Sequence, residues 1–255
     1  MNICIIGSGN ISTNLGFELK KSKFCINRIC SRNESTGKKL AKKLKADYTK
    51  KIQIPKETDL VIIGVPDDQI QQVSKKIKSK AVIHTSGTKK ISILKKCSEN
   101  YGVVWPIQTF SKQNVNFKNL PICIEANNKK FEKVLEKIFK KSTDSIFHIN
   151  YETRKILHLS AVFSCNFLNH LFYIANDLLE TKKIDFSILK PIIQETTKRA
   201  LNSNIKNNQT GPAIRKDLQT IEKHLRILSK TKKKKYLDIY KSITNSIINS
   251  NENEL

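Results

Sequence analysis

The sequence predicts an α/β fold in which an N-terminal, doubly wound and mostly parallel sheet precedes an all-α C-terminal domain. Short apolar runs alternate with helical patterns as far as residue 150, which is typical of βαβ units. A glycine-rich turn separates the first apolar run from the first helical pattern. After residue 150 the strand signals stop and only helical periodicity remains. We therefore expect two domains, residues 1–150 and 151–255.

The first domain shows alternating strand and helix patterns. Its apolar runs lack polar alternation, which indicates strands covered on both faces, as in a parallel sheet. The expected strands are 2–6, 24–30, 59–65, 81–84, 103–105, 122–124 and 146–148. A helix with Leu15 and Leu19 on its buried face follows the first strand, and three more are expected at 36–44, 67–77 and 131–139. Sheets of this kind bind ligands beyond the carboxyl ends of their strands.

The second domain is expected to be helical throughout. Its helices are expected at 156–179, 186–201, 213–228 and 236–248, and its polar tail, 249–255, is expected to fray. No apolar stretch is long enough to span a bilayer, and the first strand leaves no room ahead of it for a secretory segment. We therefore expect a cytoplasmic protein without a membrane partner.

The formal net charge of +25 is the most conspicuous bulk property. A basic surface of this size attracts nucleic acid without any sequence readout. Only six of the 47 basic residues are Arg, however, and Arg is favoured for specific phosphate and base recognition. We interpret the lysines mainly as solvated helix faces, although the charge does not exclude a nucleic-acid partner. The six cysteines show no CxxC spacing, so neither a disulfide framework nor a metal site is expected.

The turn after the first strand carries a dinucleotide-binding pattern. It consists of Gly7, Ser8, Gly9, Asn10, Ile11 and Ser12. Gly7 and Gly9 occupy the first two glycine positions of GxGxxG, one for a tight turn and one for close approach of the backbone to a pyrophosphate. Ser12 stands at the third position, where a small residue allows close helix–strand packing. The helix that follows offers free N–H groups and a positive dipole end, so this Rossmann-type turn is expected to bind the cofactor.

The residue that closes the second strand indicates which nicotinamide dinucleotide binds. An acid there holds the ribose 2′-OH of NAD, whereas an Arg accommodates the 2′-phosphate of NADP. Here Ser31 and Arg32 close the strand, and no acid stands at its end. We therefore predict NADP(H) rather than NAD(H). The alternative is a surface Arg32 that pairs with Glu34.

Two later strand ends are expected to complete the cofactor cleft. Val65, Pro66 and Asp67 end one strand with a rigid turn. His84 and Ser86 end the next strand, close to the expected position of the nicotinamide. They either hydrogen-bond the cofactor or merely shape the turn.

The loop after the strand at 103–105 adds candidate substrate contacts. Gln108 and Thr109 follow Pro106 there, at the carboxyl end of the strand. Such loops often carry binding residues, although a loop that contains proline needs no ligand to explain it.

These residues resemble a known superfamily. Gly7-Ser8-Gly9-Asn10 and Gly64-Val65-Pro66-Asp67, followed by a helical domain, are similar to the group that contains pyrroline-5-carboxylate reductase, 6-phosphogluconate dehydrogenase and deazaflavin-dependent NADP oxidoreductases. A closer resemblance, to an uncharacterised reductase-like family with a helical domain of unknown function, covers nearly the whole chain. It rests on HTSG (84–87), WPIQTF (105–110), HLSAV (158–162), NFLNH (166–170) and TGPAIRKD (210–217). The resemblance implies the fold, the cofactor class and a homodimer formed through the helical domain, but no substrate.

One departure from the superfamily limits the chemistry. The hydroxyacid dehydrogenases in it carry a catalytic Lys one helical turn before an Asn. If Asn166 fills the Asn place, the Lys place is Val162, which puts β-hydroxyacid oxidation in doubt and leaves imine reduction open. Asn166 and His170 share a helix face, so Asn166 could orient the substrate while His170, or His158 further upstream, donates a proton. The alternative is a structural histidine in the core or an interface.

A second polar group is expected on the helix at 213–228. Asp217, Thr220 and His224 fall on one face of it, so Asp217 could orient His224 as a general acid. Arg215, expected in the first turn of the same helix, could clamp a substrate carboxylate. A network at a dimer interface would explain the same pattern.

The sequence is best interpreted as an NADP(H)-dependent oxidoreductase that transfers a hydride to the imine or carbonyl carbon of a small, carboxylated substrate. One alternative is an activity of the pyrroline-5-carboxylate reductase type. From other classes, the alternatives are a dinucleotide-binding regulator without turnover and a basic nucleic-acid-binding protein that keeps the fold.

Overall fold

The computed structural model describes residues 1–110, 115–202, 205–231 and 233–252. The chain divides into two compact units, Met1–Cys165 and Asn166–Leu255. All strands found in the described residues belong to the first unit, and the second unit is built from helices and their connections.

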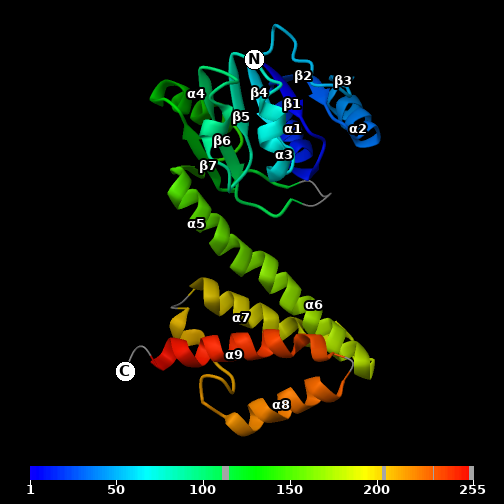
Figure 1. The fold of residues 1–255 in the computed structure, drawn as a ribbon, viewed down its shortest axis with the longest axis vertical. Coiled ribbons are helices and arrows are strands. Elements are labelled where there is room, and N and C mark those ends of the chain that lie inside the picture. The colour runs from blue at the N-terminus through cyan, green and yellow to red at the C-terminus, as the bar shows by residue number, and fades with distance from the viewer. Residues whose placement is uncertain (111–114, 203–204, 232, 253–255) are drawn as a thin grey trace. The chain divides into compact units, whose positions relative to one another are not determined.

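A mostly parallel sheet forms the centre of the first unit (Figure 1). Its strands are β1 (Asn2–Ile6), β2 (Cys25–Cys30), β3 (Asp47–Thr49), β4 (Leu60–Ile63), β5 (Ala81–His84), β6 (Asn100–Pro106), β7 (Ile122–Ala126) and β8 (Ile146–His148). Their order is β3-β2-β1-β4-β5-β6-β7-β8, and β6 with β7 is the antiparallel pair. The expected doubly wound sheet is confirmed, and its order reverses between β1 and β4, where such sheets bind ligands.

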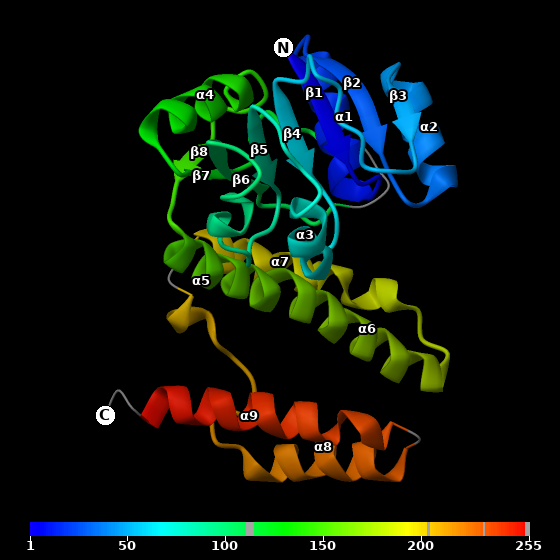
Figure 2. The same ribbon diagram turned by 45° about the horizontal axis from the view of Figure 1, so that its top comes forward.

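Helices cover both faces of this sheet (Figure 2). They are α1 (Asn10–Lys21), α2 (Glu34–Leu44), α3 (Asp67–Ser74) and α4 (Lys129–Phe139), with a 3-10 helix at Ile91–Leu94. Helix α5 (Tyr151–Ala161) follows β8 and lies at the strand ends rather than on a face (Figure 2). Because successive residues of a strand point to opposite faces, Ile3 and Ile5 join the core under α1, α2 and α4, whereas Cys4 and Ile6 join the core under α3. The strands are apolar at consecutive positions because each face is covered.

Strand β3 was not predicted from the sequence. It is a three-residue strand at the sheet edge, with Asp47 exposed, so it shows neither an apolar run nor an alternation. It pairs with β2 in parallel, Cys30 opposite Thr49, and the Tyr48 hydroxyl donates a hydrogen bond to the Ser31 carbonyl at 3.0 Å. This strand extends the cleft edge of the sheet beyond β2.

The second unit packs around a small apolar core. A π-helical segment, Val162–Phe167, joins α5 to α6 (Leu168–Leu179); α7 (Lys190–Asn202), α8 (Leu218–Lys230) and α9 (Leu237–Glu252) follow. The buried core residues are Ile174, Leu228 and Tyr236, and α8 lies beside α9 (Figure 1). None of the helices in the described ranges is both long and apolar enough to span a membrane.

Several helix boundaries in this unit differ from the expectation. The helix expected from residue 186 begins at Lys190, after a 3-10 helix at Phe186–Leu189. The helix expected from residue 213 begins at Leu218, because Asp217 caps it and Lys216 has a left-handed φ of 52° that interrupts a helix. The helix expected to end at 248 continues to Glu252. The frayed end was predicted for 249–255, of which 253–255 lie outside the described residues.

Candidate functional site

A cleft of about 890 Å³ opens at the carboxyl ends of β1 to β4. Most of the predicted cofactor residues line it together: Gly7, Ser8, Gly9, Ser31, Arg32, Val65 and Pro66. The structure therefore brings the turn after β1 and the ends of β2 and β4 to one place, as a doubly wound sheet requires.

The glycine turn has the geometry expected of a pyrophosphate-binding loop. Gly7 has φ +112°, and a Cβ built there would lie 2.4 Å from the carbonyl oxygen of Gly64, so no other residue fits. A Cβ at Gly9 would meet nothing within 4 Å. Gly9 is the N-cap of α1, whose first turn contains no acidic residue. The first-turn N–H groups, which lack acceptors within the helix, and the positive dipole end together suit an anion at this position.

Ser12 explains how the third position of the pattern works without glycine. It is buried, and its hydroxyl donates a hydrogen bond to the carbonyl oxygen of Gly64 at 3.0 Å. A Cβ at Gly64 would lie 2.2 Å from the Ser12 Oγ, so the close approach depends on Gly64 as well. Ile11 packs against the sheet core. Helix α1 and strand β4 are thus held together by one serine and one glycine.

The outer wall of the cleft is cationic. Arg32, Lys50, Lys51 and Lys76 line it, and its lining residues include no Asp or Glu among those the structure describes. The Arg32 guanidinium donates a hydrogen bond to the Gln69 side chain. The alternative partner of Arg32, Glu34, forms a 2.6 Å ion pair with Lys38 instead. Sequence reasoning missed the three lysines, because two of them follow the unpredicted strand β3.

Hydroxyl groups cluster where the glycine turn meets the end of β2. The Ser8 Oγ lies 2.7 Å from the Ser31 Oγ and 2.6 Å from the Thr36 Oγ1. Asn33 caps α2 by accepting a hydrogen bond from the Thr36 N–H. These groups can donate to or accept from ribose hydroxyls.

Asn10 has a different partner from the one expected. Its side-chain amide donates a hydrogen bond to the Phe110 carbonyl at 2.9 Å. This bond connects the loop after β6 to the start of α1. Gln108 and Thr109 lie on that loop and are exposed; the Gln108 side chain accepts from the Thr109 N–H at 2.8 Å. Their role as substrate contacts stays a prediction.

A hydrogen-bonded turn follows β5. The Asp67 carboxylate accepts from the Ser86 hydroxyl at 2.6 Å and from the Thr88 hydroxyl at 2.5 Å. His84 is fully buried, and its Nδ1 accepts from the Ser86 N–H at 3.1 Å. Burial, aided by the nearby Arg154 charge, lowers the pKa of His84 to about 3. The imidazole is therefore neutral at physiological pH. Its Nδ1 serves the turn, whereas its buried Nε2 has no hydrogen-bond partner among the described residues, so the cofactor contacts of His84 and Ser86 stay predictions.

Arg154, which sequence reasoning missed, anchors α5 to the sheet. It has no exposed surface, pairs with Glu125 of β7 and donates to the Lys89 carbonyl at 2.6 Å. One turn further along α5 lies His158, whose ring centroid is 5.6 Å from that of Trp105. A Cβ at Gly87 would lie 2.6 Å from the His158 Cδ2. The half-buried His158 is thus held over the ends of β5 and β6.

Asn166 and His170 lie at the start of the second unit. Both side chains are exposed, and the His170 ring stacks on Tyr173 with a centroid distance of 5.7 Å. Neither residue is buried in this unit, so the core-histidine alternative does not describe His170. Their catalytic roles stay predictions.

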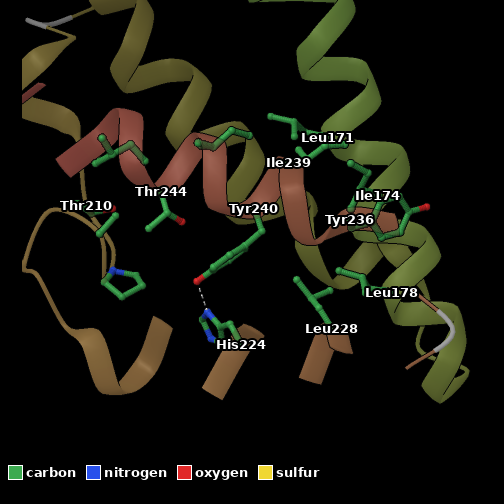
Figure 3. Close-up of a pocket in the computed structure, with 14 residues that line it drawn as sticks. Leu171, Ile174, Leu178, Thr210, His224, Leu228, Tyr236, Ile239, Tyr240 and Thr244 are labelled. Atoms are coloured by element: carbon green, nitrogen blue, oxygen red, sulfur yellow. Dashed lines mark hydrogen bonds between the residues drawn. The ribbon is translucent and has the colours of Figure 1, made fainter. Parts of the chain in front are cut away.

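The expected pairing of Asp217 with His224 is wrong. Asp217 is the N-cap of α8 and accepts hydrogen bonds from the Thr220 N–H and hydroxyl, which lower the pKa of its carboxyl. His224 Nδ1 instead contacts the Tyr240 hydroxyl at 2.8 Å, at the edge of a 310 Å³ pocket (Figure 3). Arg215 is exposed and precedes α8, so it does not occupy the first turn of that helix.

The pocket in the second unit is apolar. Figure 3 shows Leu171, Ile174 and Leu178 directed into it from α6 and Leu228 from α8, with Tyr236, Ile239 and Tyr240 on the third side. The His224–Tyr240 pair is its main polar feature. Its chemistry is thus unlike that of the cleft in the first unit.

Comparisons with known proteins agree with this architecture. Residues 2–87 match the family described as NADP oxidoreductase, coenzyme F420-dependent, and residues 120–247 match the domain of unknown function DUF2520. A Bacteroides fragilis protein assigned as an NADP oxidoreductase is 33% identical, with a TM-score of 0.88 over 97% of this chain and 98% of that one. None of the curated proteins compared matches the chain.

More distant structures share the fold. A protein of Thermotoga maritima is 21% identical, with a TM-score of 0.71 over 99% of both chains. The 1-pyrroline-5-carboxylate reductase of Streptococcus pyogenes is 15% identical, with a TM-score of 0.63 over 98% of this chain and 97% of that one. At these identities the likeness concerns the fold alone. Together the comparisons confirm the resemblance inferred from the sequence.

Proposed function

Since this chain belongs to the oxidoreductase family whose second domain is the domain of unknown function DUF2520, we propose that it is an NADP(H)-dependent reductase of a small imine or carbonyl compound. The observation that carries the proposal is the cleft beyond β1 to β4, with a glycine turn on one side and a cationic wall on the other. Bound NADPH would supply the hydride.

The chain's own residues fit a dinucleotide. The space beside Gly9 and the free N–H groups at the start of α1 suit the pyrophosphate. The hydroxyls of Ser8 and Ser31 lie where the adenosine ribose is bound in doubly wound folds, at the ends of the first two strands. The nicotinamide end of the cofactor is then directed toward β4 and β5.

His158 is the histidine of the first unit that best fits a proton donor. It is half-buried and lies over the ends of β5 and β6, held by Gly87 and Trp105. A histidine at such a position can protonate the nitrogen or oxygen that develops negative charge when the neighbouring carbon receives hydride. Asn166, His170 and His224 remain candidates from the second unit, as does Arg215 for a substrate carboxylate.

We further propose that the protein is a homodimer formed through its helical unit. Large apolar side chains there are exposed, among them Ile188 at 66%, Ile192 at 64% and Leu201 at 79%. Surfaces of this kind mark protein contacts, and a second copy of the same chain is the commonest partner. Sedimentation equilibrium tests this: a dimer supports the proposal, and a monomer at micromolar concentration contradicts it.

The test of the proposed reductase has two stages. NADPH binding is first measured by fluorescence titration, and NADPH consumption is then followed with a panel of cyclic imines, including pyrroline-5-carboxylate, and of keto acids. Saturable binding with turnover of a panel compound supports the proposal. Absence of binding to NADPH and NADH, together with retention on DNA at physiological salt, would replace it by the nucleic-acid alternative.

A further inference from the structure

Two of the four cations that line the cleft, Lys50 and Lys51, directly follow β3. Cys30 of β2 lies opposite Thr49 of β3, and the Ser31 N–H donates to the Thr49 carbonyl at 3.0 Å. The carboxyl ends of β2 and β3 therefore lie side by side, and the residues that follow each strand start from neighbouring positions. Lys50 and Lys51 follow Thr49, Arg32 follows Ser31, and all three residues line the cleft.

These cations have no acidic counterpart in the lining. Within the described part of the chain, Glu34 forms an ion pair with Lys38, and Asp47 forms one with Arg28. Lys38, with a smaller contribution from the Lys50 charge, lowers the pKa of the Glu34 carboxyl. Lys50 and Lys51 are exposed and form no ion pair with described residues. A surplus of positive charge facing a cleft attracts a polyanionic ligand.

The position of this positive charge indicates which part of a dinucleotide it would bind. In doubly wound sheets the adenosine ribose lies at the end of the second strand, so a phosphate on its 2′ oxygen is directed toward the third. A phosphate monoester carries about 1.5 to 2 negative charges at pH 7. Arg32 already donates to Gln69 and Lys76 follows α3, so Lys50 and Lys51 are the cations of the lining that stand at the end of β3.

We propose that Lys50 and Lys51, delivered by β3, determine the preference for NADPH over NADH by holding the 2′-phosphate together with Arg32. This inference rests on the proposed function and names the residues that set its cofactor specificity. Because lysines act as point charges on flexible stems, the preference depends on Coulomb attraction in an open cleft. It should therefore weaken as salt screens the charges.

The experiment measures dissociation constants of NADPH and NADH for the full chain and for Lys50→Gln/Lys51→Gln. The matched control is Lys95→Gln/Lys96→Gln, which removes the same charge from two exposed lysines beside the amino ends of β5 and β6. We expect the first variant to bind NADPH about tenfold more weakly or worse, and NADH within about twofold of wild type. The control should bind both nucleotides as the wild type does.

Displacement of bound NADPH by 2′,5′-ADP and by 5′-ADP measures the contribution of the 2′-phosphate alone, because the two competitors differ only in that group. Loss of the advantage of 2′,5′-ADP in Lys50→Gln/Lys51→Gln supports the inference. An equal loss for both nucleotides, or no loss, overturns it while wild-type binding of NADPH keeps the proposed function intact. If the wild type binds neither nucleotide, the proposed function fails and this inference fails with it. Circular dichroism of each variant establishes that it folds.

Discussion

The cleft of the first unit and the pocket of the second differ in what they offer a ligand. The cleft is lined by backbone N–H groups, hydroxyls and cations such as Arg32 and Lys51. The pocket is lined mostly by Leu, Ile and Tyr side chains, and the His224–Tyr240 pair and two threonines supply its polar groups. The first suits a large anion and the second suits apolar contact. The charged cofactor cleft and the apolar pocket therefore lie in different units of the chain.

The largest effect is expected in the glycine turn. Gly7→Ala should lower the free energy of unfolding by about 3 kcal/mol, because alanine disfavours φ +112° and its Cβ would overlap the Gly64 carbonyl. Gly9→Ala is the matched control. It should change stability by less than about 0.5 kcal/mol, yet weaken NADPH binding about tenfold because its methyl group occupies the pyrophosphate approach. Urea unfolding and fluorescence titration measure both, and a fully stable Gly7→Ala would contradict the turn geometry.

Loss of the buried ion pair should come next. Arg154→Met leaves the Glu125 carboxylate without its partner, and because Glu125 keeps 18% side-chain exposure we expect a loss of about 2 to 3 kcal/mol. In the second unit, Arg226→Met breaks a surface pair with side-chain exposures of 73% and 65% and should cost less than about 1 kcal/mol. Urea unfolding of both variants makes the comparison. Equal losses would show that Arg154 is not an anchor.

Acid should destabilise the first unit through His84. The pKa of His84 is about 3 in the folded chain and 6.5 in the reference state, so above pH 6.5 the imidazole is neutral in both states. As pH falls from 6.5 toward 3, only the unfolded chain takes up this proton, and stability falls by about 1.4 kcal/mol per pH unit. His84→Asn should remove that slope, whereas the exposed His170→Asn should keep it. Identical slopes in wild type and His84→Asn would refute the buried neutral histidine.

The smallest effect is expected in the apolar pocket. Tyr240→Phe removes the exposed hydrogen bond to His224 and should lower stability by only about 0.5 kcal/mol. NADPH binding should not change, because the pocket belongs to the other unit. A weaker affinity for NADPH in this variant would show that the pocket and the cofactor cleft are not independent.

The sequence was sufficient for the parts of the cleft that depend on local backbone chemistry. Gly7 is recognisable because only glycine allows the turn, Gly9 because it leaves space beside the start of α1, and Arg32 because it follows an apolar strand. Lys50 and Lys51 were not predicted as site residues because β3 has three residues and no apolar pattern. Their position depends on pairing with β2, which no local pattern reveals.

Side chains that act through distant contacts were also beyond sequence reasoning. Arg154 contacts Glu125 and Lys89, 29 and 65 residues away, and an Arg at the start of a helix is ordinarily exposed. The Asp217–His224 pairing failed for the opposite reason. Helical spacing suggested a shared face, but the helix begins after Asp217, so this carboxylate caps the helix instead.

The central claim is that the cleft beyond β1 to β4 holds NADP(H). Isothermal titration calorimetry of the full chain with NADPH tests it most directly. Saturable binding of one NADPH per chain, tighter than that of NADH and abolished by an excess of 2′,5′-ADP, is the expected result. No heat with either nucleotide at millimolar concentration would contradict the account.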